Sequence, residues 1–254
     1  MSYTHIIKSC SAAVMLFTRI PLWRLVRVEK EHYADALLYW PMVGFLTGAT
    51  TWIVFWATSG ILPLLPACVL AVLARLLLTG ALHEDGLADF FDGFGGGRDK
   101  SSILRIMKDS HIGTYGILGL IAYFLLYVSI LNSFYTSYLA GIIIGADVCS
   151  KLGTAVMINS LPYARSEEES KVKVLYRQIH LYEFAIVAAV CLIVLWLLET
   201  PFLALIPSLL IIIGMRQYLR NKIGGYTGDC CGATVLMAEL FFYLGALFLD
   251  TNFL

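Results

Sequence analysis

The chain has 254 residues, of which 59% are hydrophobic and 14% are charged, and its formal net charge is zero. Soluble domains carry about 25% charged residues, and nucleic-acid-binding domains usually present a basic surface. The composition therefore argues against an ordinary soluble domain and against a nucleic-acid partner. It predicts an all-α, polytopic integral membrane protein, because helices of about 20 apolar residues satisfy their own backbone hydrogen bonds in a bilayer.

Apolar segments follow one another along most of the chain. The first, residues 6–20, is short and contains Arg19, so we expect an amphipathic interfacial segment rather than a signal peptide. We expect a bundle of about seven transmembrane helices, at residues 36–58, 61–80, 114–133, 137–158, 183–199, 201–215 and 231–250. The region 183–215 is also compatible with one span and a re-entrant piece. Residues 1–254 are expected to form a single membrane-embedded domain.

Lysine and arginine alternate between these segments. Five lie before the first span, four in the loop 81–113, four in the loop 159–182 and three in the loop 216–230, whereas the other loops have none. Because cytoplasmic loops are enriched in Lys and Arg, we expect a cytoplasmic N-terminus. The three basic loops are then expected on the cytoplasmic face of a bacterial inner membrane.

The segment HEDGLADFFDGFGGGRDK, residues 83–100, is unusually acidic for this chain. Asp85, Asp89 and Asp92 are spaced to lie on one face of a helix over residues 82–94, where like charges repel. Carboxylate oxygens are ligands that Mg²⁺ prefers. The spacing favours a magnesium site, with a solvated acidic turn as the alternative, and Glu84 is expected on another face, at the surface.

Glycines and basic side chains follow the three aspartates. Gly95 and Gly96 allow an anion to approach the backbone closely, and Arg98 is positively charged. A flexible connector is the alternative interpretation of the glycines. Carboxylates beside glycines and cations are typical of phosphate chemistry, where a metal ion bridges phosphate oxygens.

Three further polar clusters lie in the predicted cytoplasmic loops: KDSHIGTYG at 108–116, PYAR at 162–165 and NKIGGYTGDCCGA at 221–233. Because these loops are all expected on the same side of the membrane, they predict one cytoplasmic active site. The candidate substrate-binding residues of all four clusters are Gly95, Gly96, Arg98, Lys108, Asp109, Ser110, Arg165, Lys222, Thr227 and Asp229.

Other polar residues fall inside the apolar segments. Asp147 and Lys151 are four residues apart and can pair on one helix face, while Arg75 and Glu239 lie in other spans. Such groups are either paired structurally or functional, so a cation transporter is one alternative. The six cysteines form no Cys-x-x-Cys motif and are expected to be reduced packing residues.

Several motifs carry a family resemblance that covers nearly the whole chain. They are FTRIP (17–21), WPMVGFLTG (40–48), LLTGALHEDGLADFFDG (77–93), IMKDSHIGTYG (106–116), PYAR (162–165) and GGYTGDCCGA (224–233). The chain resembles the cobalamin synthase family, the adenosylcobinamide-GDP ribazoletransferases. The segment LHEDGLADFFDG is highly specific to that family, and the other motifs occur in the same order.

The resemblance implies a Mg²⁺-dependent transferase of vitamin B12 biosynthesis. Adenosylcobinamide-GDP would donate its phosphocobinamide group to the 5′ oxygen of α-ribazole or α-ribazole 5′-phosphate, releasing GMP and forming adenosylcobalamin or its 5′-phosphate. Asp89 to Gly93 also look like the opening of the CDP-alcohol phosphotransferase motif, so a lipid-making phosphotransferase is the runner-up. Other nucleotide-loop enzymes and a second copy of this chain are the protein partners considered.

Within this reading, the metal ligands are expected to be Asp85, Asp89 and Asp92, with Asp229 a contributor from another loop. His83, two residues before Asp85, has two interpretations. It is either the general base that accepts the acceptor's proton, because its ordinary pKa is about 6.5, or a residue that caps the preceding span or orients Asp85. The aspartates themselves could also serve as the base.

Overall fold

The computed structural model describes residues 3–134, 138–165 and 176–253. These residues are mostly helical, and within them the only β-type pairing is an isolated bridge between Tyr163 and Tyr226. The all-α prediction is confirmed. The chain folds as two compact units, each assembled from separate stretches of sequence.

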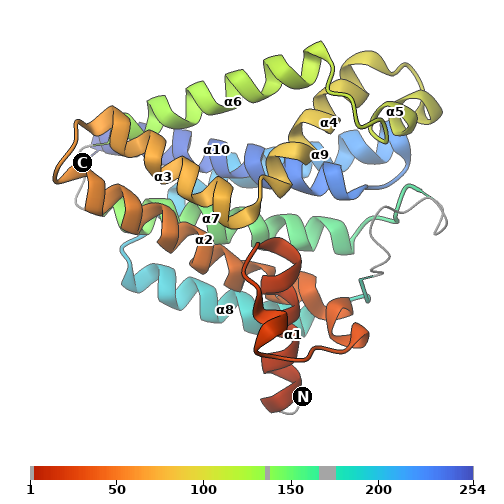
Figure 1. The fold of residues 1–254 in the computed structure, drawn as a ribbon, viewed down its shortest axis with the longest axis horizontal. Helices are drawn as coiled ribbons and strands as arrows, with labels where there is room; N and C mark the ends of the chain where they lie inside the picture. Colours follow the sequence, from red (N-terminus) through yellow and green to blue (C-terminus); the bar gives the residue numbers. More distant parts are fainter. Residues whose placement is uncertain (1–2, 135–137, 166–175, 254) are drawn as a thin grey trace. The chain divides into compact units, whose positions relative to one another are not determined.

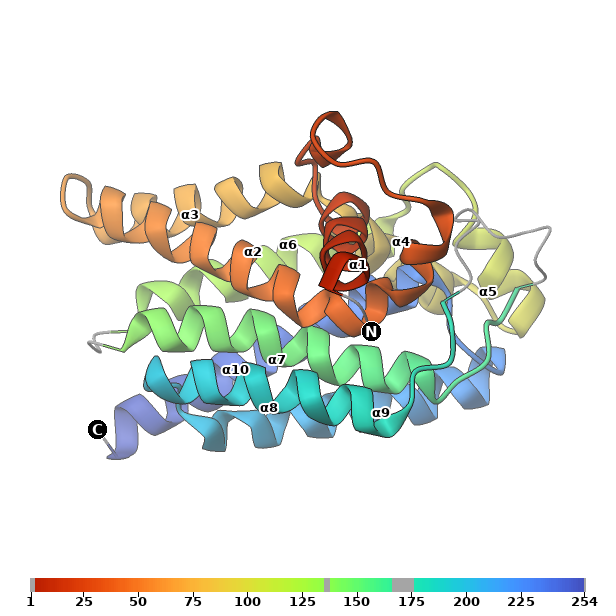
Figure 2. The same cartoon turned by 90° about the horizontal axis from the view of Figure 1, so that it is seen from below.

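The first unit comprises Met1–Gly80, Thr136–Ala155 and Val174–Thr200. Its helices are α1 (Tyr3–Phe17), η1 (Leu22–Arg24), η2 (Lys30–Asp35), α2 (Ala36–Ser59), α3 (Leu64–Thr79), most of α7 (Leu139–Asn159) and α8 (Leu181–Leu197). Helix α2 packs against α1, α3 and α8. It is therefore the central helix of this unit, as both views of the ribbon show (Figures 1 and 2).

Two glycines of the WPMVGFLTG motif bring α2 against α7. A methyl group added at Gly44 would lie 2.8 Å from the Val148 Cα atom, and one added at Gly48 would lie 2.9 Å from the Ile144 Cα atom. Small residues four apart allow helices to approach this closely in membrane proteins. This family motif thus builds a helix crossing.

The second unit comprises Ala81–Tyr135, Val156–Lys173 and Pro201–Leu254. Its helices are α4 (Leu82–Gly96), α5 (Lys100–Ile106), α6 (Thr114–Asn132), η4 (Phe202–Ala204), α9 (Leu205–Ile223) and α10 (Gly228–Phe253). Helix α4 packs against α5, α6 and α10, and α10 also packs against α6 and α9. The buried Glu239 of α10 accepts a 3.5 Å hydrogen bond from the Tyr127 hydroxyl of α6.

Each of the seven predicted spans overlaps one long α-helix, although several boundaries differ. Five helical segments are long and apolar enough to cross a membrane: Lys30–Ser59, Thr114–Asn132, Leu139–Asn159, Phe202–Ile223 and Gly228–Thr251. The count rises to six if α3 and α4 together form one broken span, and α8 is a shorter apolar helix. The protein is a multi-pass membrane protein by these criteria, while the count of seven and the orientation of the N-terminus stay predictions.

Several predicted boundaries differ from the structure. The loop 81–113 contains α5 in addition to the predicted helix α4. The loop 216–230 shrinks to residues 224–227 because α9 continues through Ile223. Long basic side chains extend towards water from a helix end, so Arg216 and Arg220 do not terminate α9. Region 183–215 forms two helices, α8 and α9, separated at residues 198–204. The loop 159–182 includes Lys171 and Lys173, which lie outside the described residues.

The paired and sulfur-containing residues agree with the sequence prediction. Lys151 donates a hydrogen bond to Asp147 on α7, and both side chains are buried. All six cysteines are free thiols, and five of them are buried. The intramembrane pair and the packing role of the cysteines are therefore confirmed.

Candidate active site

The helix predicted over residues 82–94 is confirmed and forms the centre of the candidate site. It is α4, which begins after Gly80 and Ala81, two residues in the left-handed backbone region with φ angles of 65° and 57°. The three aspartates on α4 differ in exposure: Asp85 is exposed, Asp89 is intermediate and Asp92 is buried. The burial therefore increases along the acidic face.

Asp92 caps the N-terminus of α6. Its two carboxylate oxygens accept hydrogen bonds from the backbone nitrogens of Gly113 at 2.7 Å and Gly116 at 2.8 Å. A side chain at either glycine would collide with this carboxylate, which explains the Gly-x-x-Gly spacing of the GTYG motif. A carboxylate is favourable at a helix N-terminus. Asp92 thus has a structural role, and its metal-binding role stays a prediction.

Two glycines bring the acidic helix against the start of α10. A methyl group added at Gly86 would lie 2.9 Å from the Asp229 carbonyl oxygen, and one added at Gly232 would lie 3.0 Å from the His83 carbonyl oxygen. The two helix backbones therefore touch at this crossing. Because Gly86 follows Asp85 directly, the turn that carries the accessible carboxylates of α4 lies against Asp229, in the first turn of α10.

The segments PYAR and GGYTGD pair with each other over a short stretch. The Ala164 nitrogen donates to the Tyr226 carbonyl at 2.9 Å, and the Tyr226 nitrogen donates to the Pro162 carbonyl at 3.0 Å. Gly225 is required because a side chain there would collide with the Pro162 carbonyl. Burial raises the pKa of Tyr226 above its ordinary value, so it stays a neutral phenol. This pairing holds Arg165 beside Asp229.

Arg165 is the buried cation of the site. Its side chain is 3% exposed, and its Nη2 atom lies 3.6 Å from the Asp229 Oδ2 atom. The same nitrogen donates to the Leu104 carbonyl at 3.5 Å. The Nε atom has no hydrogen-bond partner among the described residues. The guanidinium is thus enclosed by protein, yet its polar contacts to Asp229 and Leu104 are long ones.

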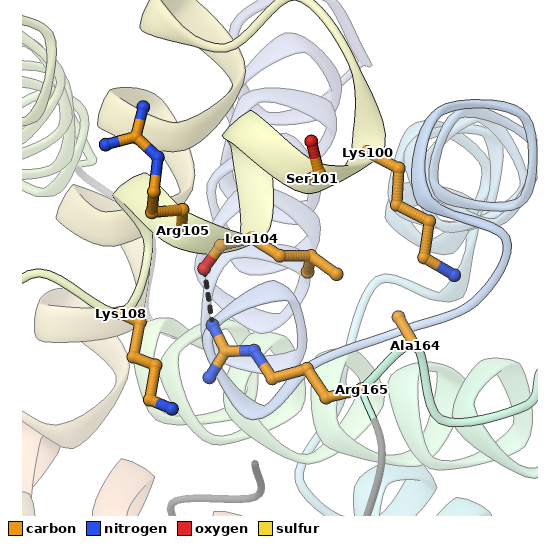
Figure 3. Close-up of a pocket in the computed structure, with 7 residues that line it drawn as sticks. All are labelled: Lys100, Ser101, Leu104, Arg105, Lys108, Ala164 and Arg165. Carbon is orange, nitrogen blue, oxygen red and sulfur yellow. Dashed lines mark hydrogen bonds between the residues drawn. The ribbon is translucent and has the colours of Figure 1, made fainter.

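A cavity of about 500 Å³ opens beside this arginine. The described residues that line it are basic and include no acidic side chain: Lys100, Ser101, Leu104, Arg105, Lys108, Ala164 and Arg165. Figure 3 shows Lys108 and Arg165 extending to the same side of α5, whereas Arg105 points away from them. The Lys100 Nζ atom is 3.6 Å from the position of a methyl group built on Gly224.

The sequence prediction therefore found part of this cavity. Lys108 and Arg165 are among the candidate substrate-binding residues predicted from the sequence, whereas Lys100 and Arg105 are not. Part of the signal was present: residues 100 and 104 are four positions apart, so they lie on one side of α5. Lys108 lies in the turn just after this helix. The N-terminus of α5 has a capping box, in which the Asp99 carboxylate accepts a hydrogen bond from the Ser102 backbone nitrogen.

Other predicted site residues lie outside the cavity lining. Arg98 and Lys222 are exposed, as are Asp109 and Ser110. Asp109 accepts hydrogen bonds from the His111 nitrogen at 3.0 Å and from its ring at 2.7 Å, and these bonds lower the pKa of Asp109. Asp109 therefore stays ionised and shapes its own turn.

Thr227 and the glycines after Asp92 have visible packing roles. The Thr227 hydroxyl accepts from the Cys230 nitrogen at 3.3 Å, at the start of α10. The glycine run is the last turn of α4 rather than a loop, and a methyl group at Gly95 would lie 2.6 Å from the Tyr115 ring. Gly96 is exposed, with the Ile106 side chain 3.4 Å from such a group. Phosphate contact by these residues stays a prediction.

The predicted surface position of Glu84 is wrong. Its side chain is 4% exposed. The physical reason is that α4 packs against α6 and α10 together, so more than one face of the helix is covered. His83 is also buried, at 5% exposure.

The carboxylates fit a magnesium ion by their chemistry. Among the described residues no group of three or more His, Cys, Asp or Glu side chains is already arranged around a metal position. Asp85, Asp89 and Asp229 nevertheless supply hard oxygen donors from two helices whose backbones touch. Magnesium commonly binds through one or two carboxylates and completes its shell with water and substrate phosphates.

The apolar helices and this polar site define a multi-pass membrane protein in which distant segments assemble carboxylates beside a cationic cavity. The match to known families is close and covers most of the sequence. The chain belongs to the family described as cobalamin-5-phosphate synthase, whose model matches residues 9–247.

Similar curated proteins carry the name adenosylcobinamide-GDP ribazoletransferase. The chain is 42% identical to the one from Shewanella baltica strain OS185 over 238 residues, covering 91% of this chain and 90% of that protein. It is 41% identical to the one from Shewanella sp. strain W3-18-1 and 40% identical to the one from Shewanella oneidensis, with the same coverage. No solved structure gives a significant match.

Proposed function

We propose that this protein transfers the phosphocobinamide group of adenosylcobinamide-GDP to α-ribazole or its phosphate and releases GMP. The family and the names of its relatives support this reaction over a CDP-alcohol phosphotransferase or a cation transporter. One observation supports a location for this reaction within the molecule. Four family motifs, separated along the chain, converge in one unit around Asp229 and Arg165.

The hydroxyl oxygen that can attack the phosphorus depends on whether the acceptor carries a 5′-phosphate. The family description, cobalamin-5-phosphate synthase, refers to a product that keeps a 5-phosphate. A 5′ oxygen that is already esterified cannot attack, so α-ribazole 5′-phosphate must use another ribose hydroxyl. The 5′ oxygen expected from the resemblance therefore cannot be the attacking atom when the acceptor is α-ribazole 5′-phosphate.

Magnesium is proposed to bind between α4 and α10. Asp85 and Asp89 would hold it from α4, and Asp229 would hold it from α10. Bound there, the ion would neutralise negative charge on the donor's diphosphate. Asp92 is less suited to this role, because both of its oxygens already accept backbone hydrogen bonds. It would instead fix α4 to the start of α6.

The transfer exchanges one phosphorus–oxygen bond for another. An acceptor hydroxyl oxygen bonds to the phosphorus that carries cobinamide, and the bond from that phosphorus to the bridging oxygen of GMP breaks. The hydroxyl proton passes to a base, for which His83 and the aspartates of α4 are the candidates. Arg165, beside Asp229, is placed to bind phosphate oxygens and to orient them, and orientation supplies much of the acceleration in phosphoryl transfer.

The site is proposed to face the cytoplasm of the inner membrane. The basic residues before the first span and in the polar loops support this orientation through the positive-inside rule. Reporter fusions after residues 98, 170 and 222 are all expected to give a cytoplasmic signal. A periplasmic signal at any one of these positions would refute the orientation.

Release of GMP tests the reaction itself. The full-length protein, purified in detergent, is incubated with adenosylcobinamide-GDP, Mg²⁺ and either α-ribazole or α-ribazole 5′-phosphate, and the nucleotide products are separated by chromatography. We expect equal amounts of GMP and of the corresponding cobalamin. Absence of GMP with both acceptors, from protein that melts cooperatively, would refute the proposed function.

A further inference from the structure

The cavity beside α5 differs chemically from the carboxylate cluster. Among the residues that the structure describes, its lining carries four cationic side chains and no carboxylate. A site of this composition needs no metal ion to attract an anion, because the protein itself supplies the positive charge. Basic side chains also provide several hydrogen-bond donors for phosphate oxygens. The cavity therefore suits an anion held directly by side chains.

The contacts of Arg165 indicate that the anion comes from a ligand, because none of the described side chains pairs closely with the guanidinium. Burying a charged group is costly unless its donors are well paired. The Arg165 side chain is 3% exposed, but its contacts to Asp229 and Leu104 measure 3.6 and 3.5 Å, and its Nε atom has no partner among the described residues. The guanidinium fork has donors left for a phosphate group.

The same arginine fixes the position of the cavity relative to the proposed metal ligands. Arg165 lines the cavity and also lies beside Asp229. An anion in the cavity would therefore be held next to the donor's diphosphate without sharing its carboxylates. The volume of about 500 Å³ exceeds what a phosphate group needs, and it falls within the range of small-ligand pockets.

We infer that the cavity binds the phosphate group of a phosphorylated acceptor nucleoside, with Lys108 and Arg165 as its main contacts and Lys100 as a further positive charge. The inference rests on the proposed function. The donor brings one diphosphate, which the carboxylates and their metal would take. An additional, metal-free phosphate site serves a substrate that brings an additional phosphate, and α-ribazole 5′-phosphate is such a substrate.

The cavity then acts as a specificity site. It would favour α-ribazole 5′-phosphate over α-ribazole by binding the phosphate that takes no part in the reaction. Such remote binding also holds the attacking hydroxyl in place. A lipid headgroup phosphate is the other source of the same chemistry near a membrane surface, and the experiment separates the two.

The test compares two acceptors with two exposed lysine variants. The variants Lys108→Gln and Lys100→Gln remove charge without opening the protein interior, and Arg220→Gln, on the exposed side of α9, is the matched control. Initial rates of GMP release are measured with each acceptor at saturating adenosylcobinamide-GDP. Calorimetry measures the binding of α-ribazole 5′-phosphate and of α-ribazole to the same proteins without donor.

We expect Lys108→Gln to lower kcat/KM for α-ribazole 5′-phosphate by roughly tenfold to a hundredfold, the usual cost of losing a charged hydrogen bond. Its kcat/KM for α-ribazole and its KM for adenosylcobinamide-GDP should match those of Arg220→Gln. Lys100→Gln should cause a smaller loss in the same direction. The calorimetric affinity for the phosphorylated acceptor should fall with the rate.

Three results would overturn the inference. An equal loss with both acceptors would assign the cavity to the donor. A loss seen only in phosphatidylglycerol vesicles, and not in phosphatidylcholine vesicles, would assign it to lipid. If both lysine variants kept the wild-type ratio of kcat/KM for α-ribazole 5′-phosphate over α-ribazole, a role of the cavity in acceptor recognition would be excluded. In each case wild-type GMP release would persist, so this failure is distinguishable from failure of the proposed function.

Discussion

Lys151 and Arg165 are both buried cations, but their surroundings differ. Lys151 is hydrogen-bonded to Asp147 on the same helix, four residues away. Among the described residues, Arg165 has only long contacts to Asp229 and to a carbonyl oxygen, and it borders a cavity. The close ion pair neutralises the charge of Lys151 and stabilises the fold, although the Asp147 Oδ2 atom has no hydrogen-bond partner among the described residues. A loosely held buried cation, by contrast, retains donors for a ligand. The comparison separates a structural charge from a functional one.

The largest effect is expected from breaking the close pair. The substitution Asp147→Asn leaves Lys151 buried without its countercharge, which costs about 3–5 kcal/mol in folding free energy. We expect a large fall in the melting temperature of the detergent-purified protein and in the yield of folded protein. The double variant Asp147→Leu with Lys151→Met should recover most of the loss, because it buries no charge. A single variant that melts like wild type would contradict the structural role.

A smaller effect is expected at Asp92, a carboxylate whose two oxygens already accept hydrogen bonds from the protein backbone. Replacing Asp92 with Ala removes the cap of α6 and should destabilise the protein by about 1 kcal/mol, within the usual range for a lost cap. Denaturation followed by circular dichroism measures this change. The Mg²⁺ concentration that gives half-maximal GMP release should stay the same. A severalfold rise in that concentration would instead support the metal-binding prediction for Asp92.

The smallest effect is expected at His83. Its backbone touches Gly232 on α10 and its side chain is buried, which favours a positioning role. We therefore expect the acidic limb of the pH–rate profile of His83→Gln to persist at the same pH, with any loss appearing in Mg²⁺ affinity or in yield. Loss of that limb, with turnover lowered by roughly 10² or more, would identify His83 as the general base instead.

Local patterns in the sequence predicted local structure well. The spacing of Asp85, Asp89 and Asp92 predicted α4, and the spacing of Asp147 and Lys151 predicted their pair, because both depend only on helical geometry. The apolar segments predicted the α-helical membrane fold for the same reason. The family motifs predicted which polar segments matter, although they did not reveal what each residue contacts.

Features that depend on packing between distant segments could not be predicted in this way. Glu84 is buried because α6 and α10 cover different faces of α4. Asp92 meets the nitrogens of Gly113 and Gly116 across more than 20 residues of chain. The cavity likewise combines Lys100 and Lys108 with Arg165. Spacing along one helix carries no information about these partners.

The charge of Asp89 provides the most direct test of the central claim, that α4 and α10 form a magnesium-dependent phosphocobinamide transfer site. Asp89→Asn keeps the shape of the side chain and removes its charge, and Arg220→Gln again serves as the control. GMP release is measured while Mg²⁺ is titrated. We predict that Asp89→Asn turns over far more slowly than wild type at limiting Mg²⁺, with an unchanged melting temperature. Full turnover by this variant at limiting Mg²⁺ would contradict the metal assignment.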